Sequence, residues 1–201
     1  MGYELKYTRR GRRSSNARLG VAGSPSVGKS TLSVLVAKRL GLPHLDVSKV
    51  AREAKAGGFD NQGMFVLNIR KARNAVRETL LKDRVRGYVV EGSFLWDLVP
   101  KSMLDLVVVL RCDPLILEKR YRRTGYSQQR IADNVVGELI GYVSAKCFEV
   151  YGEKCVEIDI SGKDVSNAVE KILYAIESKR GEVVDWLASA SSKKRLLKYL
   201  S

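Results

Sequence analysis

The chain lacks the sequence features of secreted, membrane-spanning and disulfide-stabilised proteins. Its three cysteines are odd in number and form no C-x-x-C pair, which argues against a disulfide or zinc framework and favours reduced thiols in the cytosol. No apolar stretch approaches the roughly 18 residues that a membrane span requires, and the longest, Leu104–Leu110, is expected to be a buried strand. Residues 7–18 are basic and polar, unlike the apolar core of a secretory signal. We therefore expect a cytoplasmic protein with no membrane partner.

Acidic residues are few relative to basic ones. The chain has 36 Lys and Arg residues against 22 Asp and Glu residues, which gives a formal net charge of +14 at pH 7. This excess is larger than solubility requires, and it favours a polyanionic partner such as RNA. Phosphate-handling enzymes are often basic too, so the charge alone is compatible with either interpretation.

The composition changes only at the two ends of the chain. Six basic residues and one acidic residue occupy the first eighteen positions, and further basic residues cluster near the end. We expect residues 1–16 to form a flexible basic arm, residues 17–180 a single domain, and residues 181–201 a basic helical tail.

Between the ends, segments typical of strands alternate with segments typical of helices. The expected strands are Leu19–Ala22, His44–Val47, Tyr88–Glu91, Leu104–Arg111 and Val156–Ile160. The expected helices are Lys29–Leu40, Lys49–Lys55 after a cap at Ser48, about Phe65–Asp83, one from Pro114 capped by Asp113, a long stretch from Gly125 to about Val150, and Asp164–Ser178. This alternation predicts an α/β fold with a doubly wound parallel sheet and helices on both faces.

One motif carries a specific chemical meaning. The segment Gly23–Ser30, with the sequence GSPSVGKS, matches the phosphate-binding pattern G-x-x-x-x-G-K-[ST] in full. Gly28 permits a backbone geometry in which amide groups surround a phosphate, and the following helix directs its positive end towards the anion. Lys29 would contact the β- and γ-phosphates, and the Ser30 hydroxyl would bind Mg²⁺. The predicted triphosphate-binding residues are Gly23, Ser26, Val27, Gly28, Lys29, Ser30 and Thr31.

With this loop in place, Leu19–Ile176 resembles one family. These are the small archaeal and nuclear-type eukaryotic adenylate kinases of the CINAP type (adenylate kinase isoenzyme 6), which also act in small-ribosomal-subunit maturation. The matching pieces are Gly23–Leu32, Asp46–Glu53, Val89–Ser93, Val107–Asp113 and Gly125–Glu138. The resemblance implies a P-loop nucleoside monophosphate kinase that transfers the γ-phosphoryl group of ATP to AMP with Mg²⁺. It also implies rRNA and a ribosomal protein of the S11 type (uS11) as partners.

The resemblance further implies roles for two segments. Asp46–Phe59 would form a flap for the acceptor monophosphate, with Arg52 holding the phosphate and Asp46, Val50 and Phe59 beside it. Arg120–Gln129 would form a short lid over ATP. Three lid-region arginines would neutralise the transferring phosphoryl group, and one of them, Arg123, would also contact the nucleotide; the three are Arg120, Arg123 and Arg130. The alternative for Lys119–Arg123 is a solvated helix face.

The chain departs from the family pattern at two places. The usual Asp-x-His after the third core strand is Glu91-Gly92-Ser93 here. Glu91 can still accept a hydrogen bond from a metal-bound water, so Ser30 and Glu91 are the predicted metal residues. Ser93 cannot act as a general base at neutral pH, so at most weak ATP hydrolysis is expected. Thr124 replaces the lid's usual arginine, and Arg123 could substitute for it.

Two other functions are compatible with the sequence. One is a ribosome-assembly ATPase or binding factor with little kinase activity, and the other is a small P-loop kinase with a different acceptor. The single histidine, His44, and the two tryptophans, Trp96 and Trp186, are expected to have structural roles.

Overall fold

The computed structural model describes residues 16–59, 65–82 and 87–189, together with Leu196 and Tyr199. The expected basic arm therefore lies outside the described residues, apart from its last position, and so does most of the expected tail beyond residue 189.

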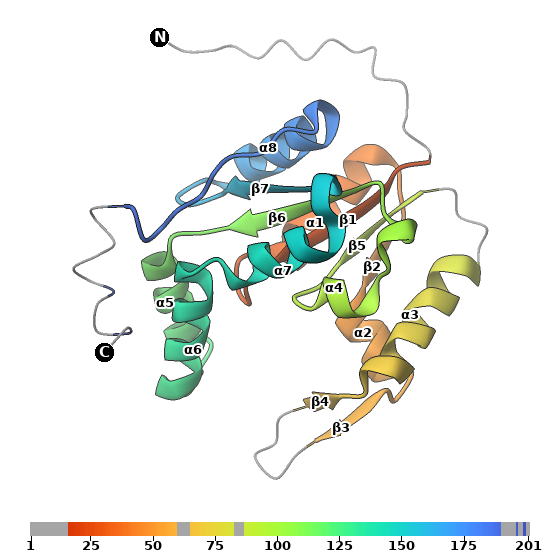
Figure 1. Cartoon of the computed structure of the whole chain (residues 1–201), viewed down its shortest axis with the longest axis horizontal. Helices are drawn as coiled ribbons and strands as arrows, with labels where there is room; N and C mark the ends of the chain where they lie inside the picture. The colour runs from red at the N-terminus through yellow and green to blue at the C-terminus, as the bar shows by residue number, and fades with distance from the viewer. Residues whose placement is uncertain (1–15, 60–64, 83–86, 190–195, 197–198, 200–201) are drawn as a thin grey trace.

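The centre of the molecule is a five-stranded parallel sheet with the strand order β2-β5-β1-β6-β7. Its strands are β1 Arg18–Gly23, β2 His44–Asp46, β5 Tyr88–Glu91, β6 Leu106–Arg111 and β7 Cys155–Asp159. Figure 1 shows helices in front of this sheet and behind it. The predicted doubly wound parallel sheet is confirmed.

Helices follow most of the strands. Their bounds are α1 Lys29–Leu40, α2 Val47–Glu53, α3 Ile69–Lys82, α4 Leu95–Leu98, α5 Pro114–Arg123, α6 Gln128–Leu139, α7 Tyr142–Tyr151 and α8 Val165–Ser178, with short 3-10 turns η1 Lys101–Met103 and η2 Gly152–Lys154. None of the helices within the described ranges has the length and apolarity needed to cross a bilayer.

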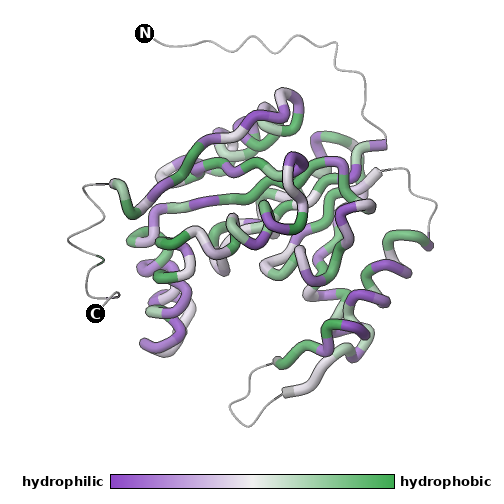
Figure 2. The backbone as a smooth tube through the Cα atoms, viewed as in Figure 1, coloured by the Kyte–Doolittle hydropathy of each residue, from purple (hydrophilic) through white to green (hydrophobic). Residues whose placement is uncertain are grey.

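The sheet separates two hydrophobic clusters. One cluster joins the sheet to α1, α5, α6 and α8, and the other joins it to α2, α3, α4 and α7. Successive residues of β6 divide between them, since Val108 belongs to the first cluster and Val109 to the second. Because both faces of the sheet are covered, the central strands β1, β5 and β6 consist mainly of apolar residues, which Figure 2 shows along the middle of the molecule.

The predicted helix at Phe65–Asp83 is wrong at its beginning. Phe65–Leu67 is a strand, β4, which pairs antiparallel with β3, Gly57–Phe59. The helix begins only at Ile69, and the Asn68 side chain accepts a hydrogen bond from the backbone N–H of Lys71 at 3.0 Å. The segment therefore begins as a strand, because its aromatic and β-branched residues pair with β3. The helical spacing determines the structure only after Asn68.

Two further local predictions are corrected. The N-cap of α2 is Asp46 rather than Ser48, because its carboxylate accepts hydrogen bonds from the backbone N–H groups of Ser48 and Lys49 at 2.7 and 3.2 Å. The long helical stretch after Gly125 is two helices, α6 and α7, and the chain turns between them at Gly141, whose φ of 69° is left-handed.

The first part of the C-terminal tail also differs from its prediction. Residues 182–189 contain a turn and no helix, although Leu196 is helical. This segment instead lies against the sheet and makes side-chain and backbone hydrogen bonds with β7. The predicted cap at Asp113 is confirmed, since its carboxylate accepts a hydrogen bond from the N–H of Leu115 at 2.7 Å.

Candidate nucleotide-binding site

The phosphate-loop motif connects β1 to α1, at the carboxyl end of the sheet's central strand. Gly23 and Gly28 have φ angles of 149° and 112°, which favour glycine. A Cβ on Gly23 would also lie 2.7 Å from the carbonyl oxygen of Leu110 on the neighbouring strand. The backbone conformation therefore favours glycine at both positions, and at Gly23 the close approach of β6 also leaves no room for a side chain.

Lys29 is held at the base of this loop. Its side chain lies in a largely buried position, with 8% of the residue exposed, and Nζ donates a hydrogen bond to the carbonyl oxygen of Ser24 at 2.9 Å. Burial lowers the pKa of Lys29 to about 8, although the carboxylates of Glu91, Asp46 and Glu138 favour its charged form. A bound phosphate would add a negative charge next to this ammonium group and hold it protonated.

The two predicted metal residues are in direct contact. Ser30 Oγ donates a hydrogen bond to Glu91 Oε1 at 2.7 Å. Glu91 is the last residue of β5 and pairs in register with Val21 of β1 and Asp46 of β2. Burial raises the pKa of Glu91, whereas the hydrogen bond from Ser30 and the charge of Lys29 oppose this rise.

This arrangement fits Mg²⁺ chemically. Mg²⁺ prefers oxygen ligands and is usually held by one or two carboxylates together with substrate phosphates and water. The hydroxyl of Ser30 and the carboxylate of Glu91 supply oxygens beside the phosphate loop. Asp46, which we predicted only at the acceptor site, adds a second carboxylate, because β2 and β5 end side by side.

Helix α5 contacts the phosphate loop from the lid side. Arg120 Nη1 donates hydrogen bonds to the carbonyl oxygens of Ser26 and Val27, both at 3.1 Å. The hydroxyl of Tyr121 donates to the carbonyl oxygen of Pro25 at 3.0 Å. Loops of this kind bind phosphate through N–H groups, so tying three carbonyl oxygens to α5 favours anion binding. The structure thus brings the predicted residue Arg120 to the loop.

The other two lid-region arginines are placed differently. Arg123 is exposed at the C-terminal end of α5. Arg130 lies over the ring of Tyr126, with its guanidinium carbon 3.9 Å from the ring centre. Tyr126 is in turn stacked on Tyr121, at 5.5 Å between ring centres. Arg130 is therefore linked to the phosphate loop through two aromatic rings.

The predicted flap, Asp46–Phe59, contains α2 and β3, and β3 pairs with β4 beyond it. Figure 1 shows this flap, with α3, at one side of the lower edge of the molecule and the lid helices α5 and α6 at the other. Of the predicted acceptor residues, Asp46 caps α2 and Arg52 is exposed on it. Val50 is buried in the hydrophobic core, so it supports the flap by packing. Phe59 ends β3, and its side chain lies outside the described part.

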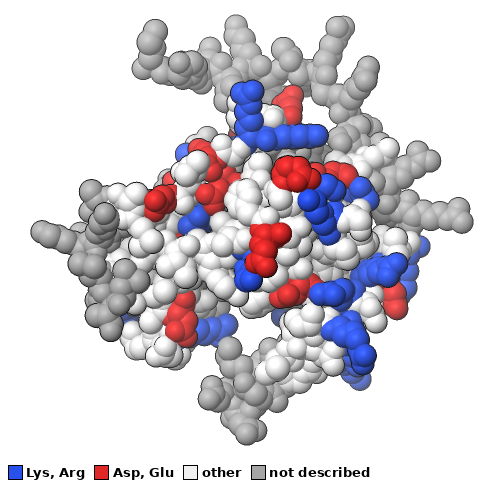
Figure 3. All heavy atoms as spheres, viewed as in Figure 1, with Lys and Arg blue, Asp and Glu red and all other residues white. Residues whose placement is uncertain are grey.

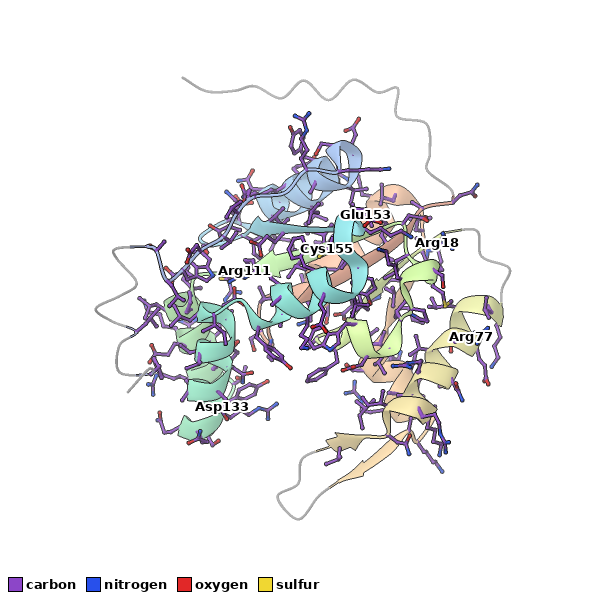
Figure 4. The ribbon with its side chains drawn as sticks, in the orientation of Figure 1. Arg18, Arg77, Arg111, Asp133, Glu153 and Cys155 are labelled. Atoms are coloured by element: carbon purple, nitrogen blue, oxygen red, sulfur yellow. The ribbon has the colours of Figure 1, made fainter. Side chains whose placement is uncertain are left out.

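Sequence reasoning missed three polar residues behind the loop. Ser24, inside the motif, is buried, and its hydroxyl donates a hydrogen bond to Glu138 Oε2 on α6. Arg111 Nε donates to Glu138 Oε1 at 2.7 Å, and Figure 4 shows Arg111 at the end of β6 nearest the lid helices. Arg111 ends a strand that is otherwise apolar. A cation at the end of a buried strand needs an acidic partner, and this was the signal in the sequence that could have indicated Glu138.

Known proteins resemble this chain in sequence and in fold. A family model described as an AAA domain matches residues 19–141. The “Putative adenylate kinase” of Pyrococcus abyssi is 34% identical over 171 residues, covering 84% of this chain and 90% of that protein. The “Adenylate kinase isoenzyme 6 homolog” of Caenorhabditis elegans is 38% identical over 138 residues, covering 68% of this chain and 75% of that protein.

A solved structure adds a comparison of the fold. Shikimate kinase from Acinetobacter baumannii, solved in complex with shikimate, has a TM-score of 0.55 and 18% identity, over 82% of this chain and 96% of that one. This likeness shows a shared kinase fold alone. The sequence relatives go further and confirm the resemblance that the motifs indicated. The chain belongs to the P-loop kinase family that includes archaeal proteins of the adenylate kinase type and the adenylate kinase isoenzyme 6 homologue of Caenorhabditis elegans.

Proposed function

We propose that this protein is a nucleoside monophosphate kinase that transfers the γ-phosphoryl group of ATP to AMP, with Mg²⁺. One observation carries the proposal: a phosphate loop with a buried, charged lysine adjoins the contact between Ser30 and Glu91, with the flap and lid elements at either side. Phosphoryl transfer asks the protein mainly for positioning and for cations around the transferring group, and this site has both.

Each residue then has a distinct task. Lys29 would neutralise the β- and γ-phosphates, and the loop from Gly23 to Thr31 would hold the triphosphate through its backbone. Ser30 and Glu91 would hold Mg²⁺, which supplies charge neutralisation at the phosphate oxygens when bound. Arg120 fixes the loop from α5. On closure of the lid, Arg123 and Arg130 would approach the phosphates and help to exclude water.

The acceptor is tested by measuring ADP formation from ATP and Mg²⁺ with AMP, with CMP and with no acceptor. We expect the fastest turnover with AMP and weak turnover without an acceptor, because Ser93 is a poor base. A higher rate with CMP than with AMP would identify CMP as the preferred acceptor. Equal rates with and without any acceptor would make the protein an ATPase and contradict the proposed kinase activity.

The flap assignment predicts the behaviour of Arg52. Replacing Arg52 by alanine should raise KM for AMP about 10- to 150-fold, the effect of losing a charged hydrogen bond to a phosphate worth about 1.5–3 kcal/mol. KM for ATP should change much less, because Lys29 and the loop hold ATP. Steady-state kinetics with each substrate varied in turn measure both constants.

The matched control is Arg39→Ala. Arg39 is also an exposed helical arginine, but it lies on α1 and pairs with Glu170 of α8 at 2.9 Å. This variant should leave both constants unchanged. If Arg52→Ala raised the two KM values equally, Arg52 would have no special place at the acceptor site.

We also propose a role in small-ribosomal-subunit maturation, in the cytoplasm, through contacts with rRNA and a ribosomal protein of the S11 type (uS11). The net charge of +14 supports it. Basic side chains gather over α3 at the lower right of Figure 3, and the exposed ones on this helix are Arg70, Lys71, Arg73, Arg77 and Lys82. Such a face binds nucleic acid by displacing counterions.

The basic arm gives this second role its test. Deleting residues 1–16 removes five basic residues and one acidic residue. RNA affinity should fall, and the slope of log affinity against log salt concentration should become shallower by about 0.7 for each lost contact to single-stranded phosphate. AMP kinase activity should be unchanged, since β1 begins only at Arg18. Identical affinities and slopes with and without the arm would contradict RNA binding by the arm.

A further inference from the structure

The segment after α8 forms a strap along the edge of the sheet. This strap, residues 181–186, follows the left-handed residue Lys179, whose φ is 53°. The N–H of Glu182 donates to the carbonyl oxygen of Glu157 on β7 at 2.8 Å. A Cβ on Gly181 would lie 2.6 Å from that same oxygen, so the chain runs closer to β7 than a side chain at this position would allow.

The strap is anchored by further polar contacts. The carboxylate of Glu182 accepts hydrogen bonds from the N–H of Asp159 and from Lys171 Nζ, both at 2.8 Å. The N–H of Val184 donates to Glu157 Oε1 at 2.9 Å, and its carbonyl oxygen accepts from Arg111 Nη1 at 3.3 Å. The strap therefore covers the outer edge of β7 and contacts the buried arginine of β6.

The end of the strap reaches a carboxylate that also touches the phosphate loop. Trp186 Nε1 donates to Glu138 Oε1 at 3.2 Å, and its indole packs against the cluster that includes α5 and α6. The other oxygen of Glu138 accepts from Ser24 Oγ, and the carbonyl of Ser24 in turn accepts from Lys29. Glu138 is only 1% exposed. The buried side chain of Glu138 thus connects the strap to Ser24, whose carbonyl oxygen accepts the hydrogen bond from Lys29.

Several donors together hold the Glu138 carboxylate in one orientation. Its Oε1 also accepts from Arg111 Nε and from the N–H of Cys112, at 2.7 and 3.2 Å. Because this carboxylate is buried, its orientation is set by these donors rather than by water, and loss of the Trp186 N–H would change the balance among them. Any rotation of Glu138 moves the hydrogen bond to Ser24, which lies in the loop itself.

We propose that the strap sets the conformation of the phosphate loop through Glu138, which makes Trp186 and Glu138 positioning residues of the nucleotide site. The proposal rests on the proposed triphosphate site but does not depend on which acceptor is used. It makes the affinity for ATP sensitive to a segment that lies on the far edge of the sheet.

The test replaces Trp186 by phenylalanine, which keeps an aromatic ring and removes the indole N–H. The dissociation constant of a non-hydrolysable ATP analogue and KM for ATP should both rise about 2- to 30-fold, the range of such indirect couplings. KM for AMP should stay unchanged. Trp96→Phe is the matched control, because Trp96 packs in the other hydrophobic cluster, and it should leave ATP affinity unchanged.

Three further measurements separate positioning from simple packing. Glu182→Gln weakens the strap at a residue that touches neither Glu138 nor the loop, and it should raise the same constants by a smaller factor. In the Trp96→Phe background Trp186 is the sole tryptophan, so its fluorescence emission should change when the ATP analogue binds. Trp186→Phe and Ser24→Ala should be non-additive in ATP affinity, because they act on one carboxylate.

The outcomes are distinct. A Trp186→Phe protein with lower thermal stability but unchanged ATP affinity would show a purely structural role and overturn the proposal. Additive effects of Trp186→Phe and Ser24→Ala would overturn it as well. Failure of the unmodified protein to bind the ATP analogue would instead contradict the proposed nucleotide site, and the strap proposal with it.

Discussion

Replacing Lys29 by alanine should lower kcat/KM for phosphoryl transfer about 10²- to 10³-fold, the usual cost of removing one preorganised charge-stabilising group. Lys29 is mostly buried at the base of the loop, and its ammonium group donates to the carbonyl of Ser24. Coupled assay of ADP formation measures the loss.

The same substitution should leave stability unchanged or raise it. The folded pKa of Lys29, about 8, lies below the unfolded value near 10.4, so its charge opposes folding. This opposition is complete below pH 8 and fades as the pH rises from 8 towards the unfolded value. A thermal unfolding temperature equal to or above that of the unmodified protein would separate lost chemistry from lost folding. A variant that kept near-normal turnover would contradict the phosphate-loop assignment.

The pH dependence of ATP binding provides an internal control for Lys29. In the free protein the ammonium group loses its proton as the pH rises through about 8, whereas bound phosphate favours the charged form. KM for ATP should therefore increase above pH 8, approaching tenfold for each pH unit, and binding there should take up a proton. Calorimetry in two buffers with different ionisation enthalpies detects that proton. A KM for ATP that stayed flat from pH 7 to 9.5 would contradict this account.

The parts of the fold that sequence predicted well are local. The loop from Gly23 to Ser30, the strand before it and the helix after it follow from a contiguous pattern, in which glycine conformation and helix start are set by neighbouring residues. The doubly wound sheet follows from the alternation of apolar runs and helical spacing. The cap at Asp113 is likewise a contact between residues two positions apart.

The parts that sequence could not predict depend on distant partners. Phe65–Leu67 is a strand because Gly57–Phe59 pairs with it. The sequence pattern of neither segment predicts this pairing. The hydrogen bond from Ser24 to Glu138 spans 114 positions. The residues of the tail on their own predicted a helix. Residues 182–184 instead form hydrogen bonds with Glu157 at the edge of β7, and the sequence of the tail gives no sign of this distant partner.

Replacing Arg111 by methionine should destabilise the protein by about 3–5 kcal/mol, the usual effect of leaving buried charge without its partner. Arg111 has a side chain that is 3% exposed and pairs with Glu138 at 2.7 Å and with Glu157 at 2.9 Å. Methionine fills a similar volume but leaves both carboxylates without the cation that compensates them. Chemical denaturation at neutral pH measures the loss as a change in the free energy of unfolding.

The matched control is Arg39→Met, whose pair with Glu170 has side chains that are 51% and 41% exposed. This exposed pair should contribute less than about 1 kcal/mol. Adding Glu138→Gln should restore part of the lost stability at pH 7, because it removes one of the two unpaired charges. A loss in Arg111→Met no larger than that in Arg39→Met would show that the buried cluster contributes no more to stability than a surface pair.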